Sequence, residues 1–330
     1  MKQFLQKKAK LVFLCMLVLL TCTACANPRG RDGKTLADQI IASEETTIDA
    51  SKINYKDISD KELKKEIKKN IKDGEYTIQP TTFKDSMSKG WFEGLIVWPI
   101  AQIINLISSK TDAGVGIILT TLLIQMLVFV FTRKSQMSAQ RLQEIQPEIQ
   151  KIQNKYKDKT DERSKMQMAQ EMQNMYQKYD VHPLGSMLIT FIQLPIMMGM
   201  YYATMRSVSV VSGSFMGISL AGTPLDGFKA LDIAYIAIYV LMVIFYIVSM
   251  KLPQWLKKWQ DKKDNVKVKK YAQEETNPMA NSMNMSMYFM TAMICIMYIS
   301  WPMAMSFYWL VSSVIRVCQS LILHQVMNKK

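Results

Sequence analysis

Five apolar segments, each close to the length of a membrane-spanning helix, dominate this chain. They alternate with lysine-rich stretches and cover about residues 114–132, 184–205, 232–250, 285–301 and 304–324. A helix needs roughly 20 predominantly apolar residues to cross the hydrocarbon core of a bilayer. The sequence therefore predicts an all-α integral membrane protein whose membrane core, residues 111–330, contains five transmembrane helices.

The distribution of positive charge predicts the orientation of these helices. The formal net charge is +14, with ten lysines and arginines in residues 133–182 and eight in 251–284, against two in 206–230. Loops rich in lysine and arginine face the cytoplasm. We therefore expect the loops after the first and third spans, and the C-terminus, inside the cell. No nucleic-acid motif accompanies the charge, so no specific nucleic-acid recognition is expected.

Residues 1–24 have the layout of a signal peptide, with a lysine-rich start, an apolar run and a region of small residues. Ala24 directly before Cys25 resembles a bacterial lipoprotein signal, which predicts lipidation of Cys25. Cys22 stands where such signals usually have leucine, so an ordinary cleaved signal is the alternative. Residues 25–90 are polar, and we expect an extracytoplasmic tether with one short amphipathic helix near residues 60–72.

Residues 91–110 are apolar but interrupted. Glu93, Pro99, Gln102 and Asn105 disfavour the alternative of a sixth spanning helix. Two tryptophans in this segment favour an amphipathic helix at the outer surface, because indole rings sit well at the level of the lipid headgroups. We therefore expect a surface helix over residues 91–110.

The first inner loop, residues 134–182, predicts an antiparallel helical hairpin in the cytoplasm. Its apolar residues recur at spacings of three and four in two runs, separated by the polar stretch 157–161. Pro147 either kinks the first arm or starts its second half. The hairpin is expected to contact a cytoplasmic partner, and a solvated helical pair without a partner is the alternative. The runs are Leu142, Ile145, Ile149, Ile152 and Tyr156, and Met168, Met172, Met175 and Tyr179.

The residues that usually carry covalent or metal chemistry form no recognisable arrangement. The five cysteines lie in apolar segments, and the two histidines lack the spacing of metal ligands. The spanning segments contain no serine–histidine pair, paired aspartates or zinc-protease motif. We therefore expect no catalytic residue, no metal and no cofactor.

Polar residues inside the apolar segments are the candidate functional residues. Arg316 lies near the middle of the last segment, where a charge costs about 2.5–3.5 kcal/mol on the gentler insertion scales. On a helix it shares one face with Trp309, Ser312, Ser313 and Ser320. The first segment carries a second polar stripe. We expect the two stripes to line a hydrophilic pocket open to the cytoplasm. The second stripe is Thr121, Gln125 and Thr132.

Each of these residues also has a plainer interpretation. Arg316 can snorkel towards the inner surface. Gln125 and the threonines can hydrogen-bond between helices, and Trp309 can anchor the helix at the outer interface.

Methionines are concentrated in the second and fourth segments. Methionine is flexible and polarizable, and suits a surface that accepts many apolar partners. Ordinary helix packing or lipid contact is an equal alternative. The residues are Met197 and Met198 beside Pro195, and Met285, Met287, Met290, Met293 and Met297.

Three stretches of the chain resemble the YidC-type membrane protein insertases of the Oxa/Alb/YidC superfamily. They are EIQPEIQKIQNKYKDK (144–159), HPLGSMLITFIQLPIMMGMYYA (182–203) and FYWLVSSVIRVCQSLI (307–322). The resemblance implies no covalent reaction, so no enzyme. It implies an insertase that admits nascent membrane proteins to a hydrophilic groove open to the cytoplasm and releases their apolar segments into the bilayer. The short N-terminal region resembles the lipoprotein-like Gram-positive members, which places the protein in a bacterial cell membrane.

The resemblance also assigns roles and partners. The groove would include Thr121, Gln125, Trp309, Ser312, Ser313 and Arg316, and clients would slide along Gln193, Pro195, Met197, Met198, Met290, Met293 and Met297. The implied partners are nascent membrane proteins, the Sec translocon, the ribosome and membrane lipids. Related proteins commonly have an arginine where this chain has Gln125, and serine or threonine where it has Arg316. We therefore expect Arg316 to supply the groove charge from the opposite wall.

Two other functional classes remain open on the sequence. A small-solute or anion transporter is the alternative that an intramembrane arginine favours. Against it, the chain shows no inverted repeat and no paired broken helices. A structural scaffold is the second alternative, and it leaves the position of Arg316 without a reason.

Overall fold

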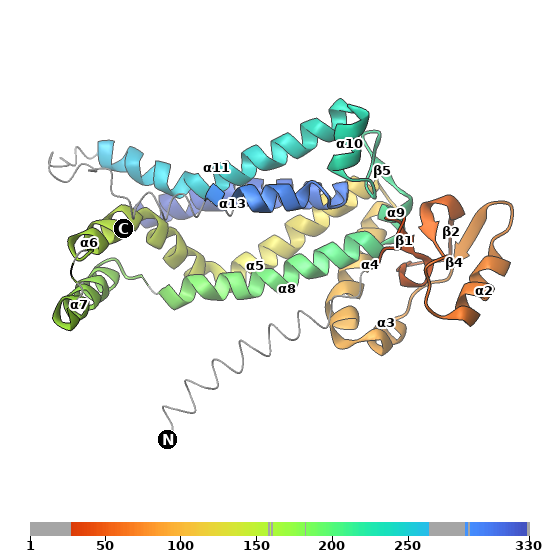
Figure 1. The fold of residues 1–330 in the computed structure, drawn as a ribbon, viewed down its shortest axis with the longest axis horizontal. Helices are drawn as coiled ribbons and strands as arrows, with labels where there is room; N and C mark the ends of the chain where they lie inside the picture. Colours follow the sequence, from red (N-terminus) through yellow and green to blue (C-terminus); the bar gives the residue numbers. More distant parts are fainter. Residues whose placement is uncertain are drawn as a thin grey trace, which may run out of the picture. The chain divides into compact units, whose positions relative to one another are not determined.

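Figure 1 shows a computed structural model of the chain, which describes residues 28–157, 159, 161–181, 183–263, 288–289 and 291–328. The expected signal peptide, Cys25 and Met290 lie outside the described residues. The chain divides into two compact units. The first is Met1–Ile117 with Leu194–Ala221, and the second is Ile118–Gln193 with Gly222–Lys330.

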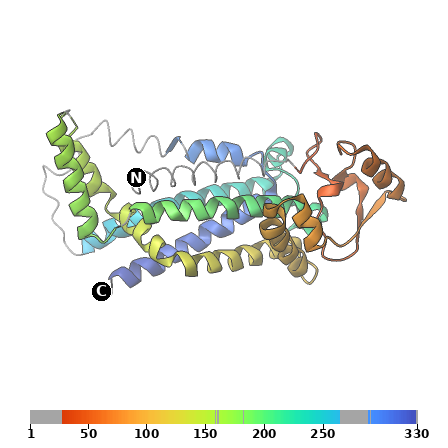
Figure 2. The same ribbon diagram turned by 90° about the horizontal axis from the view of Figure 1, so that it is seen from below.

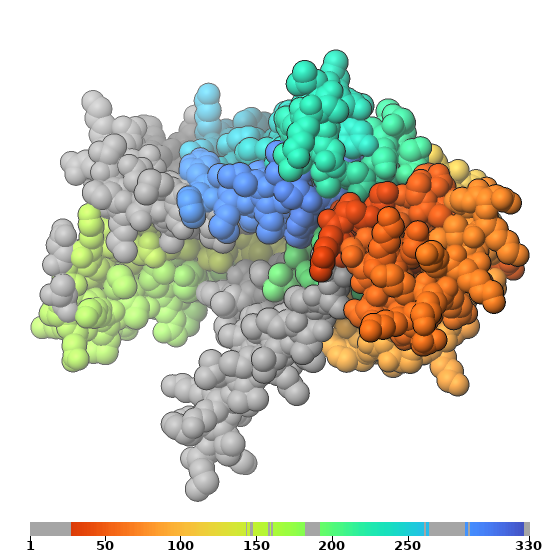
Figure 3. All heavy atoms as spheres, turned by 45° about the vertical axis from the view of Figure 1, so that its right-hand side comes forward, coloured from red at the N-terminus to blue at the C-terminus, as the bar shows by residue number. Residues whose placement is uncertain are grey.

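The first unit begins with a small α/β domain, whose atoms form one compact lobe in Figure 3. Two short ladders build it, one parallel between β1 and β3 and one antiparallel between β2 and β4. Asp60 caps helix α2 (Lys61–Asn70) by accepting hydrogen bonds from two backbone N–H groups, so the predicted amphipathic helix is confirmed. The other elements are β1 (Thr35–Leu36), η1 (Ala37–Gln39), β2 (Thr46–Asp49), η2 (Ala50–Lys52), β3 (Ile53–Asn54) and β4 (Glu75–Ile78).

This domain has a hydrophobic core, so the tether that composition predicts for residues 25–90 is wrong for the described residues. Buried apolar side chains from both ladders and α2 meet there, together with two valines of helix α9 (Val208–Ser212). Burying this surface outweighs the entropy of ordering a polar chain. The core consists of Ala37, Ile40, Ala42, Ile48, Ile53, Ile58, Ile67, Ile78, Val208 and Val211.

The expected surface helix 91–110 is a continuous helical segment preceded by α3 (Phe83–Lys89). A five-residue π turn, η3 (Glu93–Val97), leads directly into α4 (Trp98–Ser108). One face is buried at Val97, Ala101 and Ile104, while Leu95 and Leu106 are exposed. The segment therefore has one packed apolar face and one outward apolar face, and α3 and η3 lie against each other.

Asn105 is the polar centre of the packing around α4. Its side-chain amide is fully buried. The Nδ2 donates to the Ile41 carbonyl at 2.8 Å, and the Oδ1 accepts from the Ser207 hydroxyl at 2.5 Å and from the Ser209 N–H at 3.2 Å. A buried amide is tolerated when its donors and acceptors are paired. Asn105 thus joins α4 to both the α/β domain and the start of α9.

The C-terminal end of α8 (Pro183–Arg206) is fixed in the same unit. Gly199 allows α8 to approach η3 closely, because a Cβ there would lie 2.5 Å from the Ile96 side chain. Arg206 forms a buried ion pair with Glu93, and its guanidinium carbon lies 5.2 Å from the Tyr202 ring centroid. Ile41 exchanges backbone hydrogen bonds with Arg206 and Val208. The short hairpin β5 (Ser214–Phe215) and β6 (Ile218–Ser219) follows α9.

Long helices dominate the second unit. They are α5 (Ala113–Glu144), α11 (Ile233–Lys263) and α13 (Met303–Asn328). The short helix α10 (Pro224–Ala230) precedes α11, and a helical segment at residues 291–298 precedes α13. Figures 1 and 2 show α11 and α13 side by side along their lengths. Among the described residues, three helical spans are long and apolar enough to cross a membrane: Ala113–Leu142, Ile233–Gln260 and Met303–Val326.

Two shorter helices, α6 (Gln146–Lys155) and α7 (Glu162–Lys178), pack against each other in the second unit. Pro147 lies in the first turn of α6, where it lacks only an N–H that has no helical partner. The residues 134–144 belong to α5, because that helix continues to Glu144. Ile145, Ile149, Met175 and Val181 form the core between the two helices.

A polar contact at the surface of this helix pair makes its stability depend on pH. Lys155 Nζ and Tyr156 Oη donate hydrogen bonds to Glu171 Oε1, at 2.5 and 2.9 Å. These bonds, first that of Lys155, lower the pKa of Glu171 below its ordinary value of 4.5. Because the pKa is lower in the folded pair, the contact stabilises the folded helices above the unfolded pKa. That contribution is lost as the pH falls through the folded pKa.

We therefore expect Glu171→Gln to weaken the helix pair at pH 7, by an amount that decreases as the pH falls through the lowered pKa of Glu171. The side chains are solvent-exposed, so the change in hydrogen-exchange protection of α6 and α7 amides is expected to be severalfold at most. Hydrogen–deuterium exchange, corrected for intrinsic rates, measures it over a series of falling pH values. A difference between variant and wild type that does not decrease as the pH falls contradicts the assignment.

Candidate functional site

Helix α5 turns its polar side chains towards the protein and its apolar side chains outward. Thr121, Gln125 and Thr132 are buried, while Phe131 is 80% exposed. This is the reverse of a helix in a water-soluble protein and fits a helix surrounded by lipid. The exposed residues are Leu119, Leu123, Met126, Leu127, Val130 and Phe131.

Helix α13 carries the second polar stripe in the same orientation. Trp309, Ser312, Ser313 and Ser320 are buried, as the helical period predicts for one face. The Gln125 Nε2 donates to the Ser312 hydroxyl at 3.3 Å, so the two stripes meet. Nearer the chain end, Gln140 Nε2 donates to the Ser320 carbonyl at 3.1 Å. The polar faces of α5 and α13 therefore meet at two places along the helices inside the second unit, and we call this polar face-to-face region the seam.

Arg316 lies beside this seam among aromatic rings. Its Nη2 donates to the Ser313 hydroxyl at 3.2 Å. Its guanidinium carbon lies 5.7 Å from the Trp309 ring centroid and 5.9 Å from that of Tyr246 on α11. Cation–π contacts of this kind contribute about 0.5–2 kcal/mol, most where water is excluded. The guanidinium therefore points back by about one helical turn towards the N-terminal end of α13. Snorkelling would require it to point towards the C-terminal end.

Three tyrosines complete the surroundings of Arg316 and Trp309. Tyr298 stacks on Trp309 with ring centroids 4.9 Å apart, and Tyr246 meets it edge-on at 6.4 Å. Tyr308 is fully buried, and its hydroxyl accepts a hydrogen bond from Gln193 Nε2 at 3.2 Å. Sequence reasoning missed these tyrosines, because an aromatic residue in an apolar segment gives no polar signal.

The methionines of the predicted slide are placed differently in the two helices. Met293 and Met297, in the helical segment 291–298, are about half exposed on one side of that segment. Met197 and Met198, next to Pro195 inside α8, are half-buried. Gln193, assigned to the slide by resemblance, is hydrogen-bonded to Tyr308 instead of projecting freely.

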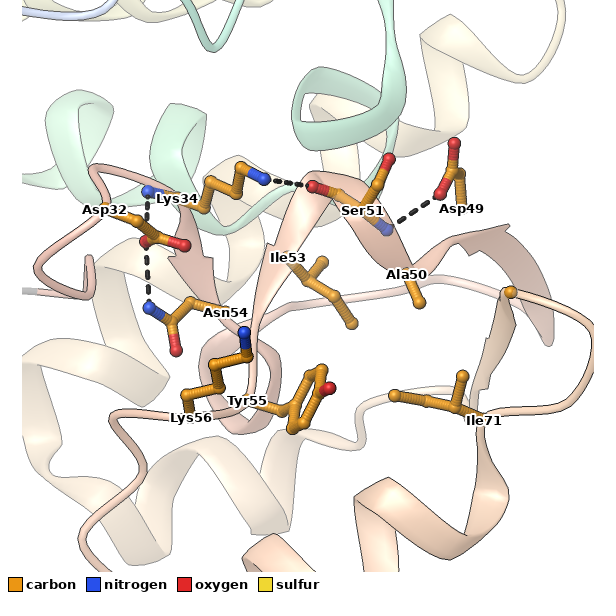
Figure 4. Close-up of a pocket in the computed structure, with 11 residues that line it drawn as sticks. Asp32, Lys34, Asp49, Ala50, Ser51, Ile53, Asn54, Tyr55, Lys56 and Ile71 are labelled. Carbon is orange, nitrogen blue, oxygen red and sulfur yellow. Dashed lines mark hydrogen bonds between the residues drawn. The ribbon is translucent and has the colours of Figure 1, made fainter.

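The α/β domain has a separate pocket of about 340 Å³, shown in Figure 4. Several of its polar groups are hydrogen-bonded to one another. Lys34 Nζ donates to the Ser51 carbonyl at 2.5 Å, Asn54 Nδ2 to Asp32 at 2.8 Å, and the Ser51 N–H to Asp49 at 2.7 Å. Within the described residues, no three histidine, cysteine or carboxylate side chains gather as a metal site.

Apolar helices with outward apolar faces and an internal polar seam define a multi-pass helical membrane protein. The sequence profile of the "60Kd inner membrane protein" family matches residues 105–330. The chain belongs to this family, which confirms the resemblance to YidC-type proteins.

Individual relatives cover most of the chain. Membrane protein insertase YidC 1 of Streptococcus pyogenes serotype M6 is 30% identical over 237 residues, 72% of this chain and 75% of the relative. Membrane protein insertase MisCA of Bacillus subtilis is 28% identical over 238 residues, 72% of this chain and 80% of the relative. Membrane protein insertase YidC of Oceanobacillus iheyensis is 28% identical over 245 residues, 74% of this chain and 87% of the relative.

Proposed function

We propose that this protein is a membrane protein insertase of the bacterial cell membrane. Its relatives carry that function in their names. The observation that carries the mechanism is the internal polar seam of α5 and α13, with Arg316 beside it among aromatic rings. An arginine kept inside a spanning helix is costly, and such residues usually mark a path for polar groups.

The proposed core contains five spanning helices. Three are α5, α11 and α13. The 24 residues of α8 add a fourth, since at about 1.5 Å per residue a helix of that length exceeds a hydrocarbon core. The segment around residues 285–301 supplies the fifth. The segment 91–110 lies at the outer surface, and α6 and α7 form a hairpin in the cytoplasm.

In this mechanism a polar client segment enters the seam from the cytoplasm. Thr121, Gln125, Ser312 and Ser313 offer hydroxyl and amide groups that replace water, so the polar segment crosses a shorter apolar distance. Arg316 attracts acidic residues of the client, because a charge acts strongly at low dielectric. It would thereby replace the arginine that relatives have at the position of Gln125.

The apolar part of the client then leaves towards lipid along methionine-rich surfaces. Met293 and Met297 are exposed enough to take part, and the flexible thioether adapts to different side chains. We further propose that the hairpin receives nascent clients from the ribosome, and that the protein acts alone or beside the Sec translocon. Lipidation at Cys25 would anchor the N-terminus outside the cell.

Reconstitution tests the proposed function directly. Purified protein in liposomes is expected to insert a single-span client with an acidic tail, measured as protease protection of that tail, above the level of empty liposomes. Anion flux from the same liposomes without client insertion would instead support the transporter class. Insertion equal to that of empty liposomes contradicts the proposal.

A further inference from the structure

We propose that the C-terminal end of α11 carries a binding site for the headgroup of an anionic phospholipid. The site is a Trp–Lys patch, which consists of Trp255, Lys258, Trp259, Lys262 and Lys263. The proposal uses the topology proposed above, with this end of α11 in the cytoplasm, and it does not depend on client insertion. Its occupant is a lipid of the inner leaflet whose phosphodiester headgroup carries a net negative charge.

The five residues of the patch project outward on one face of α11. Trp255 is 50% exposed and Trp259 is 61% exposed, and the three lysines are exposed as well. The other four residues follow Trp255 by three, four, seven and eight positions, which are the spacings of one helix face. Lys263 Nζ lies 5.7 Å from the Trp259 ring centroid. The patch is therefore a surface on which indole rings and ammonium groups adjoin.

The outward side of α11 changes its chemistry along the helix. Val240, Leu241, Ile244 and Ile247 are exposed in its first half. In the last turns, tryptophans and lysines take their place on the outward side. A lipid-facing helix shows this change where hydrocarbon gives way to headgroups, because indole rings favour that interface and a charged side chain is costly in hydrocarbon.

The length of α11 puts the patch at the level of the headgroups. The helix begins at Ile233, which is 81% exposed. At about 1.5 Å per residue, Trp255 and Trp259 lie about 33 and 39 Å further along the axis. A hydrocarbon core is about 30 Å thick, and each headgroup layer adds roughly 5–7 Å. With Ile233 at the outer boundary and a common tilt of about 20°, both indole rings lie in the inner headgroup layer.

The neighbouring elements agree with this level. Figures 1 and 2 show the C-terminal end of α11 at the same end of the second unit as α6 and α7, the helix pair that we assign to the cytoplasm. The patch therefore lies at the membrane surface where the proposed hairpin begins.

The charge of the patch selects an anionic headgroup. Residues 255–263 contain four lysines and one aspartate, which gives this stretch a net charge of +3 (4 − 1). Ammonium groups form charge-assisted hydrogen bonds to phosphate oxygens, and an indole N–H donates to a phosphate or ester oxygen. A zwitterionic headgroup carries its own ammonium group, which the lysines repel. The patch is therefore expected to prefer a lipid such as phosphatidylglycerol over phosphatidylcholine.

Helix α2 provides a comparison within the same chain. It exposes Lys65, Lys68 and Lys69 on its surface but contains no aromatic residue. Lysines of that kind are attracted to any anionic surface, whereas the two tryptophans of α11 hold the neighbouring lysines at a fixed depth in the bilayer. The α2 lysines thus serve as the matched control for charge without the tryptophans.

The test uses brominated lipids, because bromine atoms quench the fluorescence of tryptophans that they contact. Full-length protein is reconstituted in phosphatidylcholine bilayers that contain equal amounts of either brominated phosphatidylglycerol or brominated phosphatidylcholine. The quenching lost in Trp255→Phe with Trp259→Phe is the signal of the patch. We expect phosphatidylglycerol to be preferred at the patch about fivefold, the factor that one fully engaged lysine provides. Lys258→Gln, Lys262→Gln and Lys263→Gln together are expected to reduce this preference below about twofold.

Two further variants make the result specific. Replacing the three patch lysines by arginine keeps their charge and should keep the preference, which shows that the glutamine variant loses charge and not its fold. Lys65→Gln, Lys68→Gln and Lys69→Gln on α2 remove the same charge elsewhere and should leave the preference unchanged.

Several results would overturn the proposal. They are equal quenching of the wild-type patch by the two lipids, an undiminished preference in the glutamine variant of the patch, and an equal loss in the α2 control. Displacement of brominated phosphatidylglycerol by soluble glycerol 1-phosphate would instead show a site for free phosphate esters, and would also overturn the lipid assignment. No client is present in this measurement, so a failure of insertion in liposomes contradicts the proposed function and leaves this site standing.

Discussion

Arg316→Ala is expected to reduce insertion of an acid-tailed client about thirtyfold, while a neutral-tailed client is inserted nearly as well as by wild type. Truncating one partner of a buried charged contact costs about 2–5 kcal/mol, and the lower end corresponds to this factor. The neutral client makes no such contact, so it reports whether the variant is folded. Liposome insertion at equal protein density, measured by protease protection, gives both values.

A second variant tests whether the position of the positive charge can be exchanged between α13 and α5. Gln125 lies across the seam from Arg316's helix, bonded to Ser312. If the charge has moved from one wall to the other, Gln125→Arg should restore most of the lost insertion in the Arg316→Ala background. Normal insertion of the acid-tailed client by Arg316→Ala alone would refute the idea that Arg316 provides the groove charge.

The seam could be predicted from the sequence because its polar residues stand out in otherwise apolar segments. The helical period then places them on one face of each helix. Thr121, Gln125, Ser312 and Ser313 stand out for that reason, and all four are buried. The aromatic residues around Arg316 and Trp309 could not be predicted in the same way. Tyr246 and Tyr298 come from other parts of the chain, and the sequence does not specify which faces of α11 and α13 meet.

The α/β domain shows a different limit of sequence reasoning. Apart from Ile40 and Ile41, its isoleucines occur singly among polar residues, as at Ile48, Ile58 and Ile67, so few local windows look like a core. The core exists because strands far apart in sequence pair, and because Val208 and Val211 of α9 join it. The average composition of residues 25–90 contains no information about contacts between residues that are far apart in the sequence.

Arg206 shows that a positive residue counted in a loop need not contribute a free charge to that loop. The count places Arg206 among the few positive residues of the outer loop 206–230. In the structure its guanidinium is buried and paired with Glu93, more than a hundred residues earlier. The pairing neutralises the charge locally, so this arginine stabilises the fold at the end of α8.

Removing one member of this pair is expected to have the largest effect on stability. Arg206→Ala leaves the Glu93 carboxylate buried without its cation, and such losses typically cost about 3–5 kcal/mol. It also removes the contact of the guanidinium with the Tyr202 ring. We therefore expect Arg206→Ala to lower the free energy of unfolding in detergent by about that amount, measured by denaturant titration of tryptophan fluorescence.

A double-mutant cycle separates the ion pair from the packing of the arginine stem. Glu93→Gln keeps the shape of the side chain and removes its charge, so the pair Glu93→Gln with Arg206→Met buries no unpaired charge. This double variant is expected to be more stable than Arg206→Ala, because replacing both charges of a buried pair is often close to neutral. Lys65→Ala, whose partner Glu62 lies in an exposed pair on α2, is the matched control and should change stability by less than about 1 kcal/mol. Additive effects of the two single changes would show that Glu93 and Arg206 do not interact energetically, and that other contacts, such as the bond of Thr35 Oγ1 to the Met205 carbonyl, hold the end of α8.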